Sequence, residues 1–381
     1  MTPSVFARAV ALLMLMLASW PAFAHDPSAW GGLFRSRDLG ETWFPSDAGL
    51  FIGAALAVAV DPKDPNHLLY GTDTRLLRSR NGGRDWTTEA PSVFPGAVFA
   101  VAFDADGTGA LASSGTRIFR TDDGATWQDV MAPGGAAPAR AFASGAGADR
   151  VYLAGAHGLF TSDNRGRAWL RAGEGVLPDS AVRALLVIPG TPDRLFAVID
   201  GRLWAGGDQI SWRTVPGLPD GKVETLSRDA AIKDRLWGFA ADQVFVSDDL
   251  GGSWKPHGQP LADPGTSVRG IAASADGKVI VLSTHRGAWR SKDAGASWYQ
   301  IESNLPVHLE SGMLSRDPRE ASTLYAGFSL NSYGEMYRLA EQGGSTLAHL
   351  DPFSLAGAGA FLVLLIVLGS LSVRWLARVR A

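Results

Sequence analysis

The stretch Ser36-Arg-Asp38-Leu-Gly40-Glu-Thr42-Trp43 decides the fold, because copies of it recur along the chain. Clean copies occupy residues 247–254 and 291–298, and near copies occupy 79–86, 120–127 and 162–169. A seventh copy, at 205–212, keeps only its final Ser-Trp pair. The copies end on tryptophans that follow one another at intervals of 41 to 44 residues: Trp43, Trp86, Trp127, Trp169, Trp212, Trp254 and Trp298. A spacing this regular predicts a repeat protein.

Each repeat contains four short apolar runs that are bounded by Gly, Pro, Asn and Asp. In the repeat that spans 55–89, for example, we expect strands at 55–60, 67–70, 75–78 and 85–88. Four antiparallel strands in a unit of about 42 residues are typical of one propeller blade. The repeats therefore predict an all-β fold, a seven-bladed β-propeller.

The two ends of the repeat region complement each other. Residues 33–44 supply only the last two strands of a blade, whereas 312–316 and 323–327 supply only the first two. Joining the two pieces closes the ring and leaves no open strand edge. A further run at 335–339 is expected as a spare strand, which either replaces 33–36 or leads to the membrane, so eight blades are the alternative.

The residues of the repeated stretch suit a tight turn between the third and fourth strands of a blade. A glycine at the position of Gly40 adopts a positive φ at little cost. The carboxylate two residues before it accepts hydrogen bonds from the backbone of the turn, and the tryptophan buries a large ring. We therefore assign structural roles to the seven tryptophans and to Gly40, Asp38, Asp122, Asp249 and Asp293.

This turn sequence resembles the Asp box (BNR repeat), and residues 31–340 resemble the Asp-box propellers of the sialidase-like superfamily. Among these, the chain is similar to the Asp-box propellers that assist photosystem II assembly, which use an arginine patch to hold a partner. The resemblance implies the propeller fold. It carries less weight for activity, because the boxes of that superfamily lie away from the catalytic face.

Resemblance to the sialidases implies three arginines that bind the substrate carboxylate, a tyrosine paired with a glutamate as the nucleophile, and an aspartate that acts as the acid. Of its Phe-Arg-Ile-Pro segment, the stretch Leu33-Phe34-Arg35-Ser36 keeps only Phe-Arg. Tyr333 and Tyr337, near Glu335, are the remaining candidates for the nucleophile. The sequence lacks the usual serine-hydrolase, zinc-protease and P-loop motifs, and its seven histidines form no ligand pair. We expect no enzyme activity, no metal and no cofactor.

One set of charged residues recurs at the same place in several repeats. Aligning the starts of the first strands brings Arg140, Arg183, Arg269 and Glu224 to one position. First strands line a propeller's central channel, where three guanidinium groups would bind a carboxylate or phosphate. Two alternatives are open: the side chains point between blades, or Glu224 simply neutralises an arginine. The equivalent residues of the seven repeats are Leu56, Phe99, Arg140, Arg183, Glu224, Arg269 and Gly312.

Composition and the two ends narrow the class of protein. The absence of Cys excludes a disulfide scaffold, and a net charge of −3 argues against nucleic-acid binding. Residues 1–24 are typical of a secretory signal peptide, with an uncleaved anchor as the alternative. Residues 353–373 lack any charge and precede the basic tail 374–381, which predicts a transmembrane helix with its C-terminus inside. A sorting signal that is later removed is the alternative for this end.

Taken together, the sequence predicts a propeller at 25–340 joined by a linker at 341–352 to one membrane helix. We expect the protein in the inner membrane with the propeller in the periplasm. There it would serve as a non-catalytic binding platform for an envelope protein or complex, with assembly as one role. The alternative is a glycan-active protein, either a sialidase-like or other glycoside hydrolase or a lectin.

Overall fold

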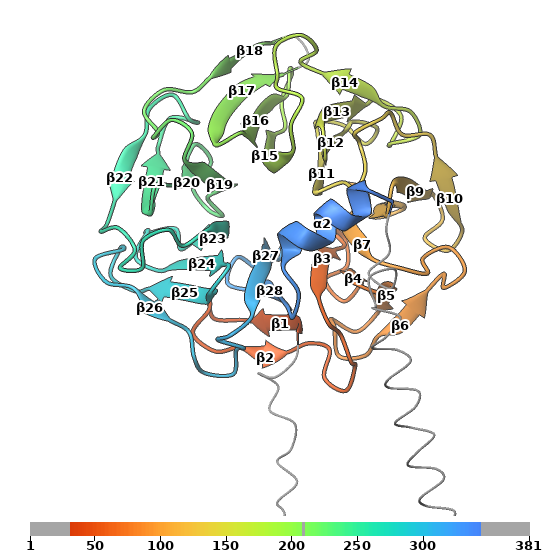
Figure 1. Cartoon of the computed structure of the whole chain (residues 1–381), viewed down its shortest axis with the longest axis horizontal. Coiled ribbons are helices and arrows are strands. Elements are labelled where there is room, and N and C mark those ends of the chain that lie inside the picture. The colour runs from red at the N-terminus through yellow and green to blue at the C-terminus, as the bar shows by residue number, and fades with distance from the viewer. Residues whose placement is uncertain (1–30, 208–209, 344–381) are drawn as a thin grey trace, which may run out of the picture. The chain divides into compact units, whose positions relative to one another are not determined.

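The computed structural model describes residues 31–207 and 210–343, which form a seven-bladed β-propeller (Figure 1). Each blade is a four-stranded antiparallel sheet. The first strands of neighbouring blades contact one another around the ring, so these strands line the central channel. The predicted all-β, seven-bladed architecture is confirmed.

Three blades follow the closing blade along the chain, each listed from the channel outward. The first contains β3 (Ala55–Val60), β4 (Leu68–Thr72), β5 (Leu76–Ser79) and β6 (Thr87–Glu89). The second contains β7 (Val98–Phe103), β8 (Ala110–Ser114), β9 (Arg117–Thr121) and β10 (Trp127–Val130). The third contains β11 (Ala141–Ser144), β12 (Val151–Gly155), β13 (Gly158–Ser162) and β14 (Leu170–Ala172).

Three further blades complete the run of sequential sheets. The fourth contains β15 (Val182–Ile188), β16 (Arg194–Ile199), β17 (Arg202–Gly207) and β18 (Ile210–Thr214). The fifth contains β19 (Val223–Arg228), β20 (Leu236–Ala240), β21 (Gln243–Ser247) and β22 (Lys255–His257). The sixth contains β23 (Val268–Ala273), β24 (Ile280–Thr284), β25 (Gly287–Ser291) and β26 (Tyr299–Gln300).

The seventh blade joins the two ends of the propeller. Its strands from the channel outward are β27 (Glu310–Arg316), β28 (Leu324–Ser329), β1 (Gly32–Ser36) and β2 (Phe44–Pro45). The register of β1 on β28 pairs Phe34 with Ala326 and Arg35 with Tyr325. This is the closure that the sequence predicted, and it leaves no unpaired edge between first and last repeats.

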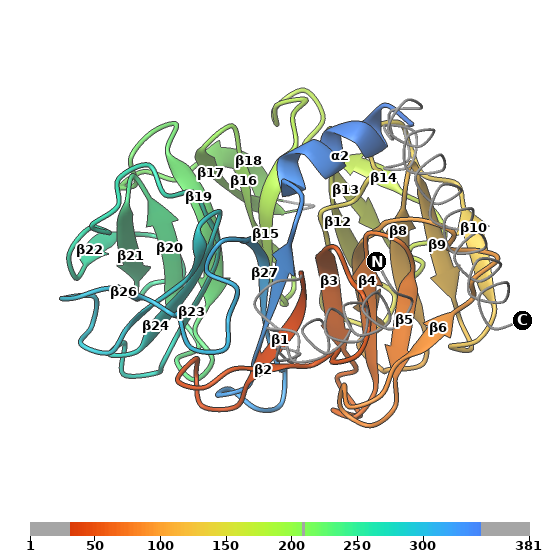
Figure 2. The ribbon, with the colours of Figure 1, turned by 60° about the horizontal axis from the view of Figure 1, so that its bottom comes forward.

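The predicted spare strand at 335–339 is wrong, because this segment is the helix α2 (Tyr333–Glu341). The buried side chains of α2 are Tyr333, Met336, Leu339 and Ala340, which recur every three or four residues and so lie on one face of a helix. With this run helical, the described residues contain no eighth blade. Figure 2 shows α2 at one end of the ring, opposite the hairpin that joins β1 to β2.

The first strands share an irregularity near their starts. The pairing of β15 with β16 passes from Val182 to Ala184 and skips Arg183, which is a β-bulge. The same shift skips one residue in four other first strands, namely Leu56, Phe99, Glu224 and Arg269. A bulge redirects the side chain of its extra residue and often lies at a functional rim.

The core lies between the blades rather than in a single centre. One cluster, for example, joins Phe196 of the fourth blade to Trp254 and Phe245 of the fifth. No described helix has the length and apolar character that a bilayer crossing requires. The predicted signal peptide (1–24) and transmembrane helix (353–373) lie outside the described residues.

Candidate functional site at the channel mouth

The repeated turns are held together by hydrogen bonds within each turn. The Asp38 carboxylate accepts from the Thr42 amide at 2.9 Å and from the Ser36 hydroxyl at 2.8 Å. The amide of Gly40, whose φ is 80°, donates to the same hydroxyl at 2.8 Å. Asp249 and Asp293 make the same contacts, and these hydrogen bonds lower the pKa of each carboxyl to about 2. In all three turns the carboxylate is used inside the turn.

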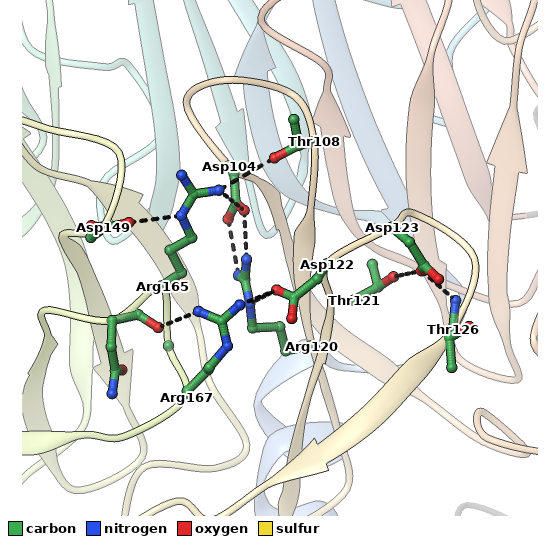
Figure 3. A network of polar contacts seen from close by, with 12 residues as sticks. Asp104, Thr108, Arg120, Thr121, Asp122, Asp123, Thr126, Asp149, Arg165 and Arg167 are labelled. Atoms are coloured by element: carbon green, nitrogen blue, oxygen red, sulfur yellow. Dashed lines mark hydrogen bonds and ion pairs between the residues drawn. The ribbon is translucent and has the colours of Figure 1, made fainter.

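The turn at 120–127 departs from the predicted register (Figure 3). Its hydrogen bonds go to Asp123, which accepts from the Thr126 amide at 2.7 Å and the Thr121 hydroxyl at 2.9 Å. The turn is one residue shorter than the others between its aspartate and its tryptophan, so the assignment of Asp122 to the box is one residue out. Asp122 instead forms ion pairs with Arg120 at 2.6 Å and with Arg167 at 2.7 Å.

Asp122 belongs to a network that links the second and third blades (Figure 3). Asp104 and Arg120, both almost fully buried, face each other at 2.7 Å. Arg165 of the next blade reaches Asp106 at 3.1 Å and Asp149 at 2.8 Å. Each guanidinium in this network has carboxylate partners within its own cluster, so the network acts as a clamp between blades.

The seven box tryptophans differ in burial. Trp43, Trp127, Trp169 and Trp254 are buried, whereas the other three are partly exposed: Trp86, Trp212 and Trp298. The indole N–H of Trp43 donates to the Gly40 carbonyl of its own turn at 3.1 Å. That of Trp127 donates to Glu89 of the preceding blade at 2.8 Å. The rings therefore brace the turns and connect neighbouring blades.

The channel mouth lies at the opposite end of the strands from these turns. In an antiparallel four-stranded blade, the start of the first strand and the turn between the third and fourth strands lie at opposite ends. Arg183, Glu224 and Arg269 sit at bulges at the start of β15, β19 and β23. Arg140 immediately precedes β11, and its amide donates to the Ala154 carbonyl at 2.8 Å.

The structure brings Arg183 and Glu224 together as an ion pair at 2.9 Å. The same Nη2 atom of Arg183 donates to the Ser267 hydroxyl at 2.6 Å and to the Val268 carbonyl at 3.4 Å. Glu224 also accepts from the Val268 amide at 2.7 Å. The Arg183 side chain is nevertheless 43% exposed. Glu224 thus takes the neutralising role that the sequence left as an alternative, but it occupies only one corner of the guanidinium.

The other two arginines contact residues that sequence reasoning did not include in the site. Arg269 pairs with Glu310 at 2.9 Å and lies 5.0 Å from the ring centre of Tyr333. Arg140 lies 4.1 Å from the ring centre of Tyr337 and 3.6 Å from the Glu341 carboxylate. Each of the three arginines therefore has one carboxylate partner. Glu310 lies two residues before the aligned Gly312, and this closeness in sequence could have pointed to it, whereas Glu341 was assigned to the linker 341–352.

Electrostatics show that the three arginines share one field. Burial lowers the pKa of the Arg183 guanidinium, and the charges of Arg269 and Arg140 lower it further, while Glu224 opposes them. Like charges that perturb one another in this way raise the local positive potential. Because each of the three arginines also has a glutamate partner, these six side chains carry no net charge, and the exposed guanidinium of Arg183 is the group that an incoming anion can reach.

The helix α2 covers one side of this mouth (Figures 1 and 2). The Tyr333 hydroxyl donates to the Ala55 carbonyl at 2.7 Å, and the ring of Tyr337 packs on Phe99 at 4.8 Å. Gly312 gives room for this helix, since a Cβ there would lie 2.2 Å from the Tyr333 ring. Of the seven equivalent positions, α2 engages five and leaves two, Arg183 and Glu224, beside it.

This arrangement argues against a sialidase-type nucleophile role for Tyr333 and Tyr337, which the sequence left only as candidates. Both Tyr333 and Tyr337 face the propeller under α2, and burial raises the pKa of each hydroxyl above its usual range. Glu335 lies on the outer side of the helix and pairs with Arg338 at 2.9 Å. The tyrosines serve to dock the helix.

The chain is a seven-bladed β-propeller, and its repeated turns resemble the Asp box. No protein family model matches it. A curated xyloglucanase from a Paenibacillus species is 26% identical over 253 residues, which cover 62% of this chain and 24% of that protein. The chain thus spans about a quarter of the length of the curated relative that it matches.

Two solved structures illustrate the range of proteins that share this fold. YCF48, solved with a D1 peptide bound, has a TM-score of 0.55 and 15% identity, and the match covers 74% of this chain and 94% of that chain. The GH74 xyloglucanase of Xanthomonas campestris has a TM-score of 0.56 and 19% identity, over 76% of this chain and 55% of that chain. One neighbour binds a peptide and the other is an enzyme, so the shared fold does not by itself select a function.

Proposed function

We propose that the protein is a non-catalytic binding platform whose channel mouth recognises an acidic group of a protein partner. The observation that carries this proposal is the state of Arg183. Among the described residues, all of its polar contacts are made by Nη2, which leaves Nη1 and Nε for a ligand. Both edges of a guanidinium that present two parallel N–H groups include Nη2, so the free Nη1 and Nε each offer an acidic group one charge-assisted hydrogen bond.

The surroundings of Arg183 strengthen this assignment. Ser267 and Glu224 hold its Nη2 corner in place, so less side-chain freedom is lost when a ligand binds. Arg140 and Arg269 add positive charge near it. The neighbour YCF48 was solved with a D1 peptide bound, which shows that a propeller of this fold accepts a protein segment as its ligand. By analogy, the partner here is a protein, and assisting the assembly of an envelope complex is a suitable role.

Two variants with a matched control test the site. Membranes that contain the intact protein are solubilised and the partner is recovered by pull-down. Arg183→Ala is expected to weaken its binding tenfold or more, and Arg183→Lys is expected to rescue poorly because one ammonium nitrogen cannot both keep the contacts of Nη2 and donate to the ligand from the positions of Nη1 and Nε. Arg202→Ala is the control, since Arg202 is also about half exposed and paired with one carboxylate, Asp220, in the same blade. Equal binding by Arg183→Ala and the wild type would overturn the proposal.

The cellular location is part of the proposal. A signal peptide at 1–24 and a membrane helix at 353–373 would place the propeller in the periplasm and anchor it in the inner membrane. A reporter that functions only in the periplasm should be active when fused before Asp351 and inactive when fused after Ala381. Activity at the C-terminal position contradicts this orientation.

A glycan-active protein is the second candidate, and the xyloglucanase relative favours it. Glycoside hydrolysis requires two carboxyl groups about 5 to 9.5 Å apart across the scissile bond. At the channel mouth Glu224, Glu310 and Glu341 instead each contact an arginine. Release of reducing ends from xyloglucan by the wild type, and its loss in Glu224→Gln or Glu310→Gln, would establish this candidate in place of the first.

A further inference from the structure

The helix α2 contacts the channel mouth through a defined set of side chains. Tyr333, Tyr337 and Glu341 lie at intervals of four residues, so they project from one side of the helix. The two tyrosine rings pack on Arg269 and Arg140, and Glu341 reaches Arg140 as well. Between them, Met336 and Ala340 pack with Leu56 and Phe99 at the channel mouth. The helix α2 thus occupies part of the channel mouth, where a ligand would otherwise bind.

We infer that α2 is a displaceable occupant of the partner site, and that the partner supplies a helix of the same chemistry. Such a helix carries two aromatic side chains four residues apart and an acidic side chain four residues further on. This inference rests on the proposed function, because it names the partner segment and the regulation of that site. While α2 is docked, the partner reaches only Arg183; when α2 is released, Arg140 and Arg269 become available too.

Several features of α2 suit release. It has nine residues, a length at which an isolated helix is marginal in water, so it depends on the surface beneath it. The side chain of its N-cap residue Ser332 makes no capping hydrogen bond. At the other end, Arg140 and Glu341 are 3.6 Å apart and both are partly exposed, so their contact is weak and open to competition.

The two ends of α2 are held by contacts of different strength, so one end should leave the channel mouth before the other. Tyr333 is buried, its hydroxyl bonds the Ala55 carbonyl, and its amide donates to Glu310 at 3.0 Å. Tyr337 and Glu341 depend on Arg140, which lies three blades away from β27 around the ring. Release therefore begins at the Glu341 end. Helix-in-groove binding of this kind is a common mode of peptide recognition.

A synthetic peptide with the sequence of residues 331–343, labelled with a fluorophore at its N-terminus, serves as the probe. It is added to the full-length detergent-solubilised protein and its anisotropy is measured. The wild type should bind it poorly, because the chain's own helix competes at high effective concentration. In the Tyr333→Ala/Tyr337→Ala variant, which weakens that helix, the peptide should bind at least tenfold more tightly. A peptide with both tyrosines replaced by alanine is the control and should not bind.

Two further substitutions in the double variant locate the bound peptide. Adding Arg140→Ala should abolish the gain in peptide binding, whereas adding Arg183→Ala should leave it within about twofold, because Arg183 contacts no residue of α2. A double variant that melts like the wild type yet fails to bind the peptide overturns the inference. Loss of the peptide on Arg183→Ala would overturn it as well.

A spin label provides a readout that does not depend on the double variant. The chain contains no cysteine, so Gln342→Cys gives a single attachment site at the exposed end of α2. Saturating peptide should convert the label from restricted to mobile, and no change at millimolar peptide contradicts displacement. These results are separate from the pull-down: if the peptide displaces α2 but partner binding ignores Arg183, then the proposed function fails and displacement by the helix peptide still stands.

Discussion

The two ends of the propeller use the same residue types differently. At the end with the box turns, Arg120 and Arg165 are surrounded by the carboxylates of their own network (Figure 3). At the channel mouth, Arg183 is 43% exposed and is held at a single corner. Both ends are rich in arginine, so composition does not distinguish them. The difference is whether each guanidinium has used its donors inside the fold, and for this reason we propose the channel mouth as the end that recognises other molecules.

The largest expected effect concerns the box end. Trp254→Ala removes a buried indole from the interface between the fourth and fifth blades, and we expect it to lower the free energy of unfolding by about 3–5 kcal/mol. Urea unfolding followed by circular dichroism measures this loss. Trp298→Ala is the matched control, since Trp298 is partly exposed and should lose less. The reverse order would contradict the structural assignment of the box tryptophans.

A pH titration separates two kinds of carboxylate. Asp47 is buried beside the Leu33 amide and the Tyr70 hydroxyl, and this burial raises its pKa to about 6. The folded state therefore holds the Asp47 proton more tightly than the unfolded state does, so stability falls as pH rises from about 4 to about 6. A loss of about 1–3 kcal/mol is expected across this window. The box carboxylate of Asp249, whose pKa is about 2, contributes the opposite slope, which appears only below pH 4.

Asp47→Asn is the variant that tests this sign. The amide keeps an oxygen for the Leu33 amide but does not titrate, so the fall in stability between pH 4 and pH 6 should shrink. Urea unfolding at each pH provides the measurement. A variant with the same pH profile as the wild type would show that another group is responsible.

A smaller effect is expected for a box aspartate. Asp249→Ala leaves the Ser253 amide without its acceptor, but the turn is exposed and water replaces part of the contact. We expect a loss of about 1 kcal/mol in unfolding free energy. Partner binding should stay unchanged, because the turn lies at the other end of the blade from Arg183. Abolished binding with unaltered melting would move the functional site to the box end.

The smallest expected change in stability is that of Arg183→Ala. An exposed ion pair contributes about 0–1 kcal/mol, so the variant should melt within a few degrees of the wild type while binding its partner at least tenfold more weakly. Partner binding by the wild type should also fall with added salt, though by less than for a fully exposed patch. Binding that ignores salt would argue against a charged contact.

Much of the fold could be predicted from the sequence, because the strands expected in one repeat could be compared with those expected in the other repeats. The tryptophan interval located the blades, and the partial repeats at the two ends predicted which strands would meet. The segment of α2 was misread because a single unit has no such comparison. Its apolar residues fit a short strand when only 335–339 are considered, whereas the helical period becomes visible once Tyr333 and Ala340 are included.

The site was predictable in position but not in its contacts. Strand alternation alone does not tell whether Arg183 points into the channel, since the bulge that redirects it depends on how β15 pairs with β16. The docking of Tyr337 on Arg140 joins segments far apart in the chain, and no local pattern encodes it. The register of the turn at 120–127 was misassigned for a related reason. Asp122 has the expected spacing to Gly124, whereas Asp123 has the expected spacing to Thr121, and only the hydrogen bonds select Asp123.

The closing blade constrains how the molecule forms. Since β1 pairs with β28, strand β1 is synthesised early but has no partner strand until β28, near the other end of the propeller, has been synthesised. Contacts between such distant parts of a chain are slow to form, and an edge strand that stays open invites pairing with other chains. We therefore expect the ring to fold late and in one final step, with the nascent protein most prone to aggregation just before β27 and β28 appear. A chaperone that shields β1 would shorten that exposure.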